Sequence, residues 1–583
     1  MVLENVLEKK KIGENEIKEA HATLRKYKDG KKVLEQRIVE DELFWKRKNW
    51  QHTKGGEDTP SSGWTLNAIL NRHADMMDNY PEAVLLPREA SDEESAKVLS
   101  SIIPVIFEQN GFKKTYSDSC WYKLKHGCVA YGVFWNGSAE DGKGAAEIKY
   151  LDLLNIFWEP GIKDIQKSRN LFICDLVPIV DIEEKYPDIT IKGSDTGELS
   201  KYMHDETIDT SDKVLVVDWY YKRNGVLHYC KFCEENVLFA SENEKGYENG
   251  WYEDGKYPVV FDVLYPEEGT PVGFGIISIT KEPQMYIDKL DANIMRHTHL
   301  ASHPRYFAKA DMGINKAEFL DVNNSIIEVE GIIDEERLVQ IRPPEISSAL
   351  FKHRTEKINE LKETAGNTDF TQGNTAKGVT SGTAIATLQE AGNKLSRDLI
   401  ESAREAYKDI VHMLIERLRQ FYTIERVYRI TQPNDQGNQF VAFDNSALVP
   451  QQIEGVDGET LFRKPIFDIT VHAQKQNPFS TLSQNETAMN LYSAGFFNPE
   501  MAQQSLMALK LMTFEGKEEV VAYVEQGQTL FNQMQQMMMQ MQQLMQENAF
   551  LKGGMPNQAA GNPMAQQGNP MMQQNVPMMQ QLM

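Results

Sequence analysis

Apolar residues recur every three or four positions over several long stretches of the chain, which is typical of amphipathic helices. The first 50 residues have this spacing and carry many charges of both signs. Residues 44–50 close the stretch with Phe, Trp, Lys and Arg side chains. The commoner interpretation of such a cluster is a packed helix with a solvated basic face.

A second helix is expected from Ser61 or Ser62, which are candidate caps, to Pro81, which would stop it. Its predicted apolar face consists of Leu66, Ile69, Leu70, Ala74 and Met77. Residues 91–112 predict another helix. Residues 113–137 predict a helix that passes into a strand.

Short β-like runs separated by turns dominate residues 145–265. The clearest pair is 214–221 and 226–232, which flank Asn224 and Gly225. Asn-Gly supplies the positive φ angles that a two-residue hairpin turn needs, so these runs predict an antiparallel hairpin.

The pattern then predicts a helix (275–302), a compact β-rich piece (303–344) and a second helix (345–365). The first helix is expected to bend near Pro283 and to end at Pro304. The flanking helices must run antiparallel to return the chain, so the β-rich piece lies at the end of a two-helix stalk. Two helices bury little on their own, and we expect such stalks to pack side by side in an oligomer.

Residues 366–382 read GNTDFTQGNTAKGVTSG, with only Phe370, Ala376 and Val379 as apolar residues. Loops of more than about 12–15 residues are uncommon in compact domains and are usually functional or disordered. This loop is expected at the end of the stalk opposite to the β-rich piece. If many copies formed a ring, one polar loop per subunit would project toward the axis.

Residues 383–422 sustain helical spacing over a length on the order of 55–60 Å, and strand-like runs follow over 424–475. Helices are expected again over 479–525. Beyond Gln526 the composition changes, because 13 of the 25 Met residues lie there together with many Gln. An approximate heptad seam consists of Phe531, Met534, Met538, Met541, Met545 and Asn548. After Gly553 the Pro, Gly, Asn and Gln content indicates disorder.

Composition narrows the classes of function. The net charge of −23 argues against a protein that grips nucleic acid through a basic surface, because such binding neutralises phosphates with Lys and Arg. It does not exclude a protein past which nucleic acid slides. We expect no transmembrane helix and no signal peptide, since no long apolar stretch exists. Five cysteines are few and odd in number, which fits a reducing, cytosolic compartment without disulfides.

Two sets of cysteines are candidates for chemistry. Cys230 and Cys233 form a CxxC, but zinc needs two further ligands, and redox pairs normally lie at a helix start. In the second strand of a hairpin, alternation puts the two thiols on opposite faces, so ordinary strand cysteines are predicted. Cys120, His126 and Cys128 suggest a nucleophile and base, but no partner acid follows, and structural roles are favoured.

Three histidines near the end of the first stalk helix, His297, His299 and His303, suggest a metal or pH-sensing site. His297 and His299 do not share a helical face, which argues against it. The chain has no GxxxxGK[ST] motif, so an ATP-driven motor would be another protein. We therefore expect no catalytic residues, no metal and no cofactor.

The order of these elements resembles the portal protein family of tailed bacteriophages, and the short-tailed-phage type in particular. The resemblance is carried by the stalk entry VGFGIISITKEPQMYIDKLDANIMRH, the HPR exit, the return helix, the loop GNTDFTQGNTAKGVTSGTA and the long helix behind it. It covers most of the chain, from about residue 30 to about residue 550, and it depends on the ordered set rather than on one motif.

The resemblance implies a multidomain, ring-forming α+β fold, with twelve subunits at one capsid vertex through which duplex DNA enters and leaves. In chain order its parts would be an N-terminal wing (1–274), a first stem helix (275–302), a small clip (303–344), a second stem helix (345–365), a tunnel loop (366–382), the rest of the wing (383–475), a helical crown (476–525), a coiled or barrel-like Met/Gln helix (526–552) and a disordered tail (553–583).

A tunnel that lets DNA slide should hold few fixed cations, since each phosphate contact by Lys or Arg adds salt-dependent affinity. The loop fits this need, because Lys377 is its only cation and Asp369 its only anion. Its hydroxyl and amide groups can exchange hydrogen bonds with phosphates through water. The candidate loop residues are Thr368, Asp369, Phe370, Thr371, Gln372, Asn374, Thr375, Lys377, Thr380 and Ser381.

By resemblance the clip would dock the large terminase subunit and later the tail adaptor, and the ring would also meet the major capsid and scaffolding proteins. The protein would reside at the virion vertex and, during assembly, in the bacterial cytoplasm, without a membrane partner. The candidate clip residues are Arg305, Lys309, Asp311, Lys316, Glu318, Asp334, Glu335, Glu336 and Arg337.

Other classes of protein stay open at this point. A cytosolic scaffold or binding protein could oligomerise through the Met/Gln helix alone and would lose its assembly without residues 526–583. A thiol or metal enzyme would need zinc or a reactive thiol at Cys230 or Cys233. The Met seam could be membrane-active, although its polar face carries Gln rather than Lys or Arg. The loop could be a plain disordered linker, and residues 44–50 could contact DNA or the capsid.

Overall fold

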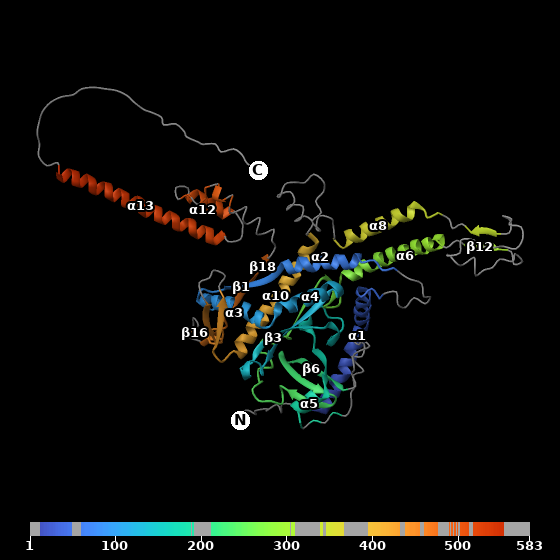
Figure 1. Cartoon of the computed structure of the whole chain (residues 1–583). Coiled ribbons are helices and arrows are strands. Elements are labelled where there is room, and N and C mark those ends of the chain that lie inside the picture. The colour runs from blue at the N-terminus through green and yellow to red at the C-terminus, as the bar shows by residue number, and fades with distance from the viewer. Residues whose placement is uncertain are drawn as a thin grey trace, which may run out of the picture. The chain divides into compact units, whose positions relative to one another are not determined.

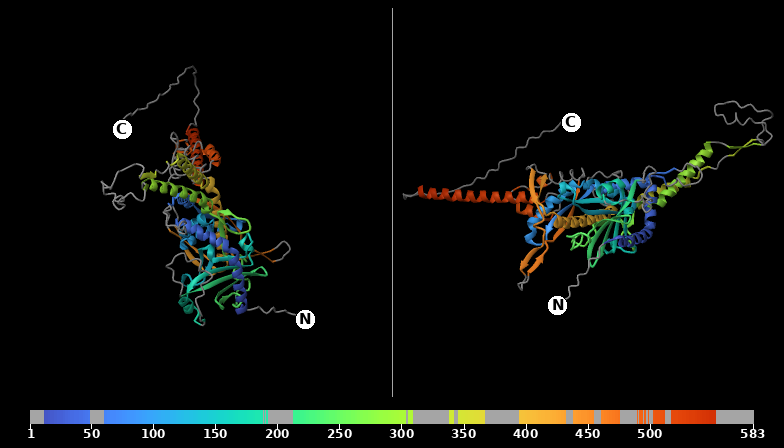
Figure 2. Two further views of the ribbon diagram at one scale, coloured as in Figure 1. Left: turned by 90° about the vertical axis from the view of Figure 1, so that its right-hand side faces the viewer. Right: turned by 90° about the horizontal axis from the view of Figure 1, so that it is seen from below.

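The computed structural model of the 583-residue chain divides into two compact units, Met1–Gln476 and Asn477–Met583, each described by itself (Figures 1 and 2). It describes residues 12–48, 60–187, 189, 191, 212–302, 305–308, 338–341, 345–366, 394–431, 438–454, 460–475, 489, 491–493, 495–496, 498, 502–511 and 517–552.

The first unit combines long helices with several small antiparallel sheets, which confirms the expected α+β class. Its helices are α1 (Glu14–Trp45), α2 (Trp64–Asp78), α3 (Glu93–Gln109), α4 (Phe112–His126), α5 (Ile179–Lys185), α6 (Ile276–Ser302), α8 (Ser348–Thr364) and α10 (Lys394–Phe421).

Two larger sheets form the β-rich part of this unit. One has the order β3 (Ala145–Leu151), β2 (Cys128–Asn136) and β9 (Val259–Val263). The other has the order β4 (Ile156–Trp158), β5 (Asn170–Pro178), β6 (Lys213–Arg223), β7 (Val226–Cys233) and β8 (Asn236–Ala240).

Five strand pairs complete the described part of the unit. They are β1 (Asn79–Pro87) with β18 (Phe467–Lys475), β10 (Tyr265–Pro266) with β11 (Gly273–Phe274), β12 (Arg305–Ala308) with β13 (Leu338–Ile341), β14 (Arg426–Thr431) with β15 (Asn438–Phe443), and β16 (Gln451–Glu454) with β17 (Thr460–Arg463).

The β6–β7 hairpin confirms the prediction made from its turn. Asn224 and Gly225 have φ angles of 52° and 81°, the left-handed values that such a turn requires. Val217 lies opposite Phe232, and both side chains are fully buried.

The predicted end of the second helix is wrong. α2 ends at Asp78, and Pro81 lies inside β1, where Leu85 faces Ile469 of β18. A two-stranded ribbon has only edge strands, and an edge strand accepts proline because the missing N–H can face away from the partner. The capping expectation also fails, since the N-cap is Gly63 and no side chain caps the helix there.

The largest core surrounds α10. The apolar face of this helix is buried from Leu399 to Leu418 at helical spacing, and it packs with residues of α3, α4 and β2. The helix is therefore the central support of the first unit. Its buried apolar residues are Leu399, Ala403, Ala406, Tyr407, Ile410, Val411, Met413, Leu414, Ile415 and Leu418.

A buried ion pair fastens α10 to its neighbours. Lys123 of α4 donates from Nζ to Asp262 of β9 at 2.6 Å, to the Ser402 hydroxyl at 2.7 Å and to the Leu399 carbonyl at 3.2 Å. The two charged side chains are 0% and 2% exposed. Burial raises the pKa of Asp262, and the Lys123 charge opposes that shift. One side chain thus links three elements that are distant in sequence.

The Gly-Phe-Gly run before α6 passes very close to the turn between α4 and β2. A Cβ on Gly275 would lie 2.3 Å from the Lys125 carbonyl oxygen, and one on Gly127 would lie 2.0 Å from the Phe274 carbonyl carbon. Gly127 also has a φ of 85°, which favours glycine. This close approach fixes where α6 begins.

The second unit contains α12 (Ala502–Leu511) and α13 (Lys517–Lys552). Leu491, Leu509 and Val524 form its small core, with Val520 and Val521 packed against it. α13 runs without interruption through residue 526, where the sequence predicts a boundary between the crown and the Met/Gln helix. The helix starts earlier because Val520 and Val524 continue the apolar spacing toward the N-terminus.

Candidate functional site: the α6–α8 hairpin and its base

α6 and α8 lie side by side and run in opposite directions (Figure 1). Ile287 of α6 is buried with Ile358 and Leu361 of α8. Further along α6, Asp291 meets Arg354, which lies nearer the start of α8. Later positions of one helix therefore face earlier positions of the other, which is the geometry expected of a chain that leaves and returns. We call this pair the α6–α8 hairpin.

Polar contacts hold the exposed part of the hairpin together. Arg354 donates from Nη2 to Asp291 Oδ2 at 3.0 Å and from Nε to Asp291 Oδ1. The hydrogen bonds to Asp291 raise the pKa of Arg354. The rings of Tyr286 and His353 meet edge to face with their centroids 5.6 Å apart. Two planar, charged groups in fork geometry fix the register of the helices better than a single contact would.

The strand pair β12–β13 extends the hairpin beyond the ends of the two helices, as Figure 1 shows at β12. Arg305 lies opposite Ile341, and Ala308 lies opposite Leu338. Arg305 is the only predicted clip residue among the residues that the structure describes. The others lie outside them: Lys309, Asp311, Lys316, Glu318, Asp334, Glu335, Glu336 and Arg337.

At the base of the hairpin, α6 binds the N-terminal end of α2. Asp288 Oδ1 accepts from the Ser62 N–H and the Ser62 hydroxyl, both at 2.9 Å. Gln284 Oε1 accepts from the Thr65 N–H at 3.2 Å. The first turn of a helix has free N–H groups. Gln284 of the neighbouring helix, rather than the serine predicted from the sequence, accepts from the one on Thr65, and Asp288 binds Ser62 just before the helix begins.

Arg72 of α2 occupies the same base. Its Nη2 donates to the carbonyl oxygens of Ala365 at 3.2 Å and of Gly366 at 2.9 Å, at the end of α8. Its Nη1 donates to the hydroxyl of Ser396, in the first turns of α10, and lies 3.5 Å from Asp75 Oδ2. Ser396 in turn donates to Asp75 at 2.7 Å. A single guanidinium therefore contacts the described residues on both sides of segment 367–393.

Sequence reasoning did not single out Arg72, Gln284 or Asp288. A signal existed, because Arg72 falls at helical spacing among the buried Ala68, Ile69 and Met76. A charged residue inside an apolar stripe needs a partner, since burying an unpaired charge is costly.

The predicted loop residues lie within segment 367–393, outside the described residues. The structure describes only Gly366 of that loop, which has a left-handed φ of 66° directly after α8. The residues so placed are Thr368, Asp369, Phe370, Thr371, Gln372, Asn374, Thr375, Lys377, Thr380 and Ser381.

The α6–α8 hairpin exposes large apolar side chains. Tyr286 and Met295 of α6 are 45% and 50% exposed, and Phe351 of α8 is 48% exposed. The hairpin core is small, with Ile287, Ile358 and Leu361 as its buried residues. A projection with so little core and so much exposed apolar surface is typical of a subunit that packs against others.

The cysteines are not placed for nucleophilic or redox chemistry. All five cysteines are free and buried, and burial raises the pKa of Cys230 and Cys233 to about 12. Cys230 belongs to one core cluster and Cys233 to another, which confirms that they lie on opposite faces of β7. Burial also raises the pKa of Cys120 and Cys128 well above the usual range.

Among the described residues, no group of three or more His, Cys, Asp or Glu side chains is arranged to hold a metal ion. His303 lies outside them. The 44–50 cluster is a packed helix end as far as it is described, with Phe44 buried and the Trp45 ring 5.9 Å from that of Trp121.

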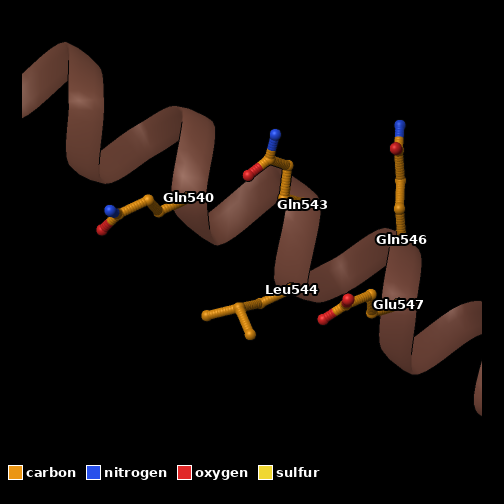
Figure 3. A pocket seen from close by; sticks show the side chains of 5 residues that line it. All are labelled: Gln540, Gln543, Leu544, Gln546 and Glu547. Carbon is orange, nitrogen blue, oxygen red and sulfur yellow. The ribbon is translucent and has the colours of Figure 1, made fainter.

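Two concave surfaces offer no clear ligand. One, of about 390 Å³, lies between β9 and the middle of α10. Its floor includes Val260 and Met413, and its rim combines Lys163, Lys256 and Asp409, so it selects neither charge. The other is lined by residues 540–547 of α13. Figure 3 shows that the lining side chains all project outward from this single helix. In the described chain, none of the helices combines the length and apolar character needed to cross a membrane.

Comparison with known families agrees with the resemblance seen in the sequence. The family described as phage P22-like portal protein matches residues 65–258 and 224–583. No curated protein matches the chain. The family matches span α2, the α6–α8 hairpin, α10 and the second unit, and together they cover most of the sequence. Portal proteins are non-enzymatic and form an oligomeric ring that passes phage DNA during packaging and ejection. The chain belongs to the phage P22-like portal protein family.

Proposed function

We propose that this protein forms a ring of twelve subunits at one capsid vertex, with the α6–α8 hairpins side by side around a channel for double-stranded DNA. The observation that carries the proposal is the hairpin itself. It exposes Tyr286, Met295 and Phe351 but buries only a small core of its own. In a cyclic ring each subunit uses two different faces toward its neighbours, and the two helices supply two such faces.

Residues 366–382 are the proposed tunnel loop. Gly366 and Ser396, described residues that precede and follow segment 367–393, both contact Arg72 at the base of the hairpin and not at the β12–β13 end. The hydroxyl and amide side chains of Thr368, Thr371, Gln372, Asn374, Thr375, Thr380 and Ser381 would face passing phosphates, with Asp369, Phe370 and Lys377 beside them. With one cation per loop, salt-dependent affinity for DNA stays low and the duplex can slide.

The β12–β13 end of the hairpin is the proposed clip, where the large terminase subunit binds during packaging and the tail adaptor binds afterwards. The charged residues between Arg305 and Arg337 would provide the docking contacts. Exchange of one partner for another favours polar, reversible contacts over a large apolar patch. The major capsid and scaffolding proteins would contact the outer parts of the ring.

The Met/Gln part of α13 is proposed to associate with the same helix of neighbouring subunits. Val520 and Val524 pack in the small core of the second unit. The heptad seam continues this spacing through Phe531, Met534 and Met538, and Met534 and Met538 are 48% and 55% exposed. A stripe that is covered at one end and open at the other is suited to an intermolecular coiled or barrel-like bundle.

The decisive experiment is the native mass of the purified protein with and without residues 526–583, followed by end-on electron micrographs. A species of about twelve subunit masses with a central hole, kept after truncation, is the expected result, because the hairpins and the first unit would make the ring. A small oligomer that falls to monomers on truncation would favour a scaffold assembled through the Met/Gln helix and would overturn the proposed architecture.

A further inference from the structure

The side chain of Arg72 is unusual in its burial and in the number of elements it meets. The residue is only 5% exposed. Its guanidinium donates to two carbonyl groups at the end of α8 and to Ser396 of α10, and Asp75 lies beside it. α2 is thereby bonded to the returning helix of the hairpin and to the central helix of the core at one point.

The chemistry of this contact requires arginine. The last carbonyl groups of a helix have no partner within the helix, and a cation near them is favoured by the helix dipole. A guanidinium presents five N–H donors in one plane, so it can serve the α8 carbonyl groups on one side and Ser396 and Asp75 on the other. A lysine ammonium is a compact charge on a flexible stem, and it cannot span both sets.

Asp75 completes the arrangement. It accepts from Ser396 at 2.7 Å and lies 3.5 Å from Arg72, so it holds the hydroxyl and the cation together. Burial raises the pKa of Asp75, and the Ser396 hydroxyl and Arg72 oppose that shift. The three side chains from α2 and α10 form one hydrogen-bonded group against the end of α8.

We propose that Arg72, supported by Asp75, is a positioning residue that keeps the end of α8 and the start of α10 at a fixed spacing. These two points are the anchors of segment 367–393. We call Arg72, Asp75 and Ser396 the latch. The latch transmits movement of the hairpin to the core and determines where segment 367–393 leaves the described part of the subunit. Its role in DNA passage rests on the proposed function of residues 366–382 as the tunnel loop.

The test compares assembled rings of Arg72→Met, Arg72→Lys and Ser396→Ala with the unaltered protein by amide hydrogen exchange. Methionine suits a helix about as well as arginine, so Arg72→Met removes the contacts and not the helix. The matched control is Arg417→Met, since Arg417 is likewise a buried arginine in an ion pair, with Asp254, but stacks on Tyr252 at 3.3 Å and contacts neither end of the segment.

We expect amides of residues 361–366 and of 396–403 to exchange roughly ten-fold faster in Arg72→Met, because a hydrogen bond to a charged group is lost at each end. In Arg72→Lys, the exchange rates of residues 361–366 and 396–403 should not both return to those of the unaltered protein. Ser396→Ala should affect 396–403 more than 361–366. Arg417→Met leaves Asp254 without its buried partner, so it should speed exchange in the last turns of α10, without a selective effect on 361–366 and 396–403. Faster exchange at only one end in Arg72→Met, or equal effects in the Arg417 control, would overturn the latch.

The functional arm measures the fraction of particles that retain full-length DNA when the variant ring replaces the normal one. Arg72→Met is expected to lower this fraction while the ring still assembles, and Arg417→Met rings are the comparison. Normal DNA retention despite faster exchange at both ends would overturn the role of the latch in DNA passage. Deletion of residues 368–381 tests the loop separately. Normal packaging after that deletion would defeat the tunnel-loop assignment without changing the exchange result for Arg72.

Discussion

Arg354 of α8 donates hydrogen bonds to both carboxylate oxygens of Asp291, a residue of α6 that lies 63 positions earlier in the chain. This contact lies in the exposed half of the α6–α8 hairpin, with side chains 32% and 18% exposed. It fixes the register of the two helices where the apolar core between them has already ended.

Breaking this pair should loosen the hairpin and leave the core intact. We expect Arg354→Leu to lower the free energy of local opening of α6 and α8 by about 0.5–1 kcal/mol, the range for a partly exposed ion pair. The effect should shrink in high salt. Hydrogen exchange within residues 286–294 and 351–358, with a double-mutant cycle through Asp291→Asn, measures it. Lys352→Leu, which removes an exposed pair with Glu356 inside α8, is the matched control and should change less. A coupling energy near zero would contradict the assignment.

Removing one member of the buried pair in the core should cost far more. Lys123→Met leaves the carboxyl of Asp262 buried without its cation, and we expect a loss of about 3–5 kcal/mol of unfolding free energy. The double variant Lys123→Met with Asp262→Val should recover most of this loss, because no unpaired charge remains. Thermal or denaturant unfolding measures both. Arg88→Met, which removes the exposed pair with Asp468, is the control and should have no measurable effect. Equal losses in the single and double variants would show that the charges are not the cause.

Acid should weaken the contact between α1 and α4 through Glu42. Hydrogen bonds from His126 and Lys125 hold the pKa of Glu42 at about 2, below its ordinary value. A carboxylate with a lowered pKa in the folded state stabilises the protein above its unfolded pKa, and this stabilisation is lost as pH falls. We expect a loss of about 1–2 kcal/mol between pH 5 and pH 2 that Glu42→Gln abolishes, allowing for partial exposure. Glu108→Gln, at an exposed site, should keep the unaltered pH profile.

The glycines at the entry to α6 should not tolerate a side chain. Gly275→Ala would place a Cβ 2.3 Å from the Lys125 carbonyl oxygen, a contact with backbone that cannot move freely. We expect a loss of at least about 2–3 kcal/mol or failure to assemble, in the upper range for single substitutions. Gly527→Ala in α13 is the control, since no atom lies within 4 Å of its Cβ position. That change should stabilise the helix by about 0.5–1 kcal/mol. Similar thermal stability of both variants would contradict the close approach.

Sequence patterns predicted the helices and strands that are specified by residues close together in the chain. The Asn224-Gly225 turn identified the β6–β7 hairpin, and apolar spacing identified helices in the ranges of α6, α8 and α10. The family match bears out the resemblance drawn from the order of the elements. Each of these signals depends on residues within one or two helical turns or strand repeats.

Long-range contacts explain what the sequence did not reveal. β1 was hidden because its partner β18 lies at the other end of the first unit in sequence, and Pro81 appeared to end a helix. Leu70 was expected on the buried face of α2 but is 46% exposed, whereas Arg72 is buried. The position of α8 and α10 beside α2 decides which face of α2 is buried. The spacing of residues within α2 does not reveal that position. The candidate loop and all of the candidate clip except Arg305 lie outside the described residues, so their roles stay predictions.

The ladder between Arg305 and Ile341 has a consequence for how this part of the protein can vary. The chain leaves the hairpin at Ala308 and rejoins it at Leu338, directly across the ladder. An insert whose two ends are neighbours can be lengthened, shortened or exchanged without stretching the scaffold that carries it. Related chains that share the α6–α8 hairpin are therefore free to carry different inserts between Ala308 and Leu338, and a change of insert need not alter the two helices.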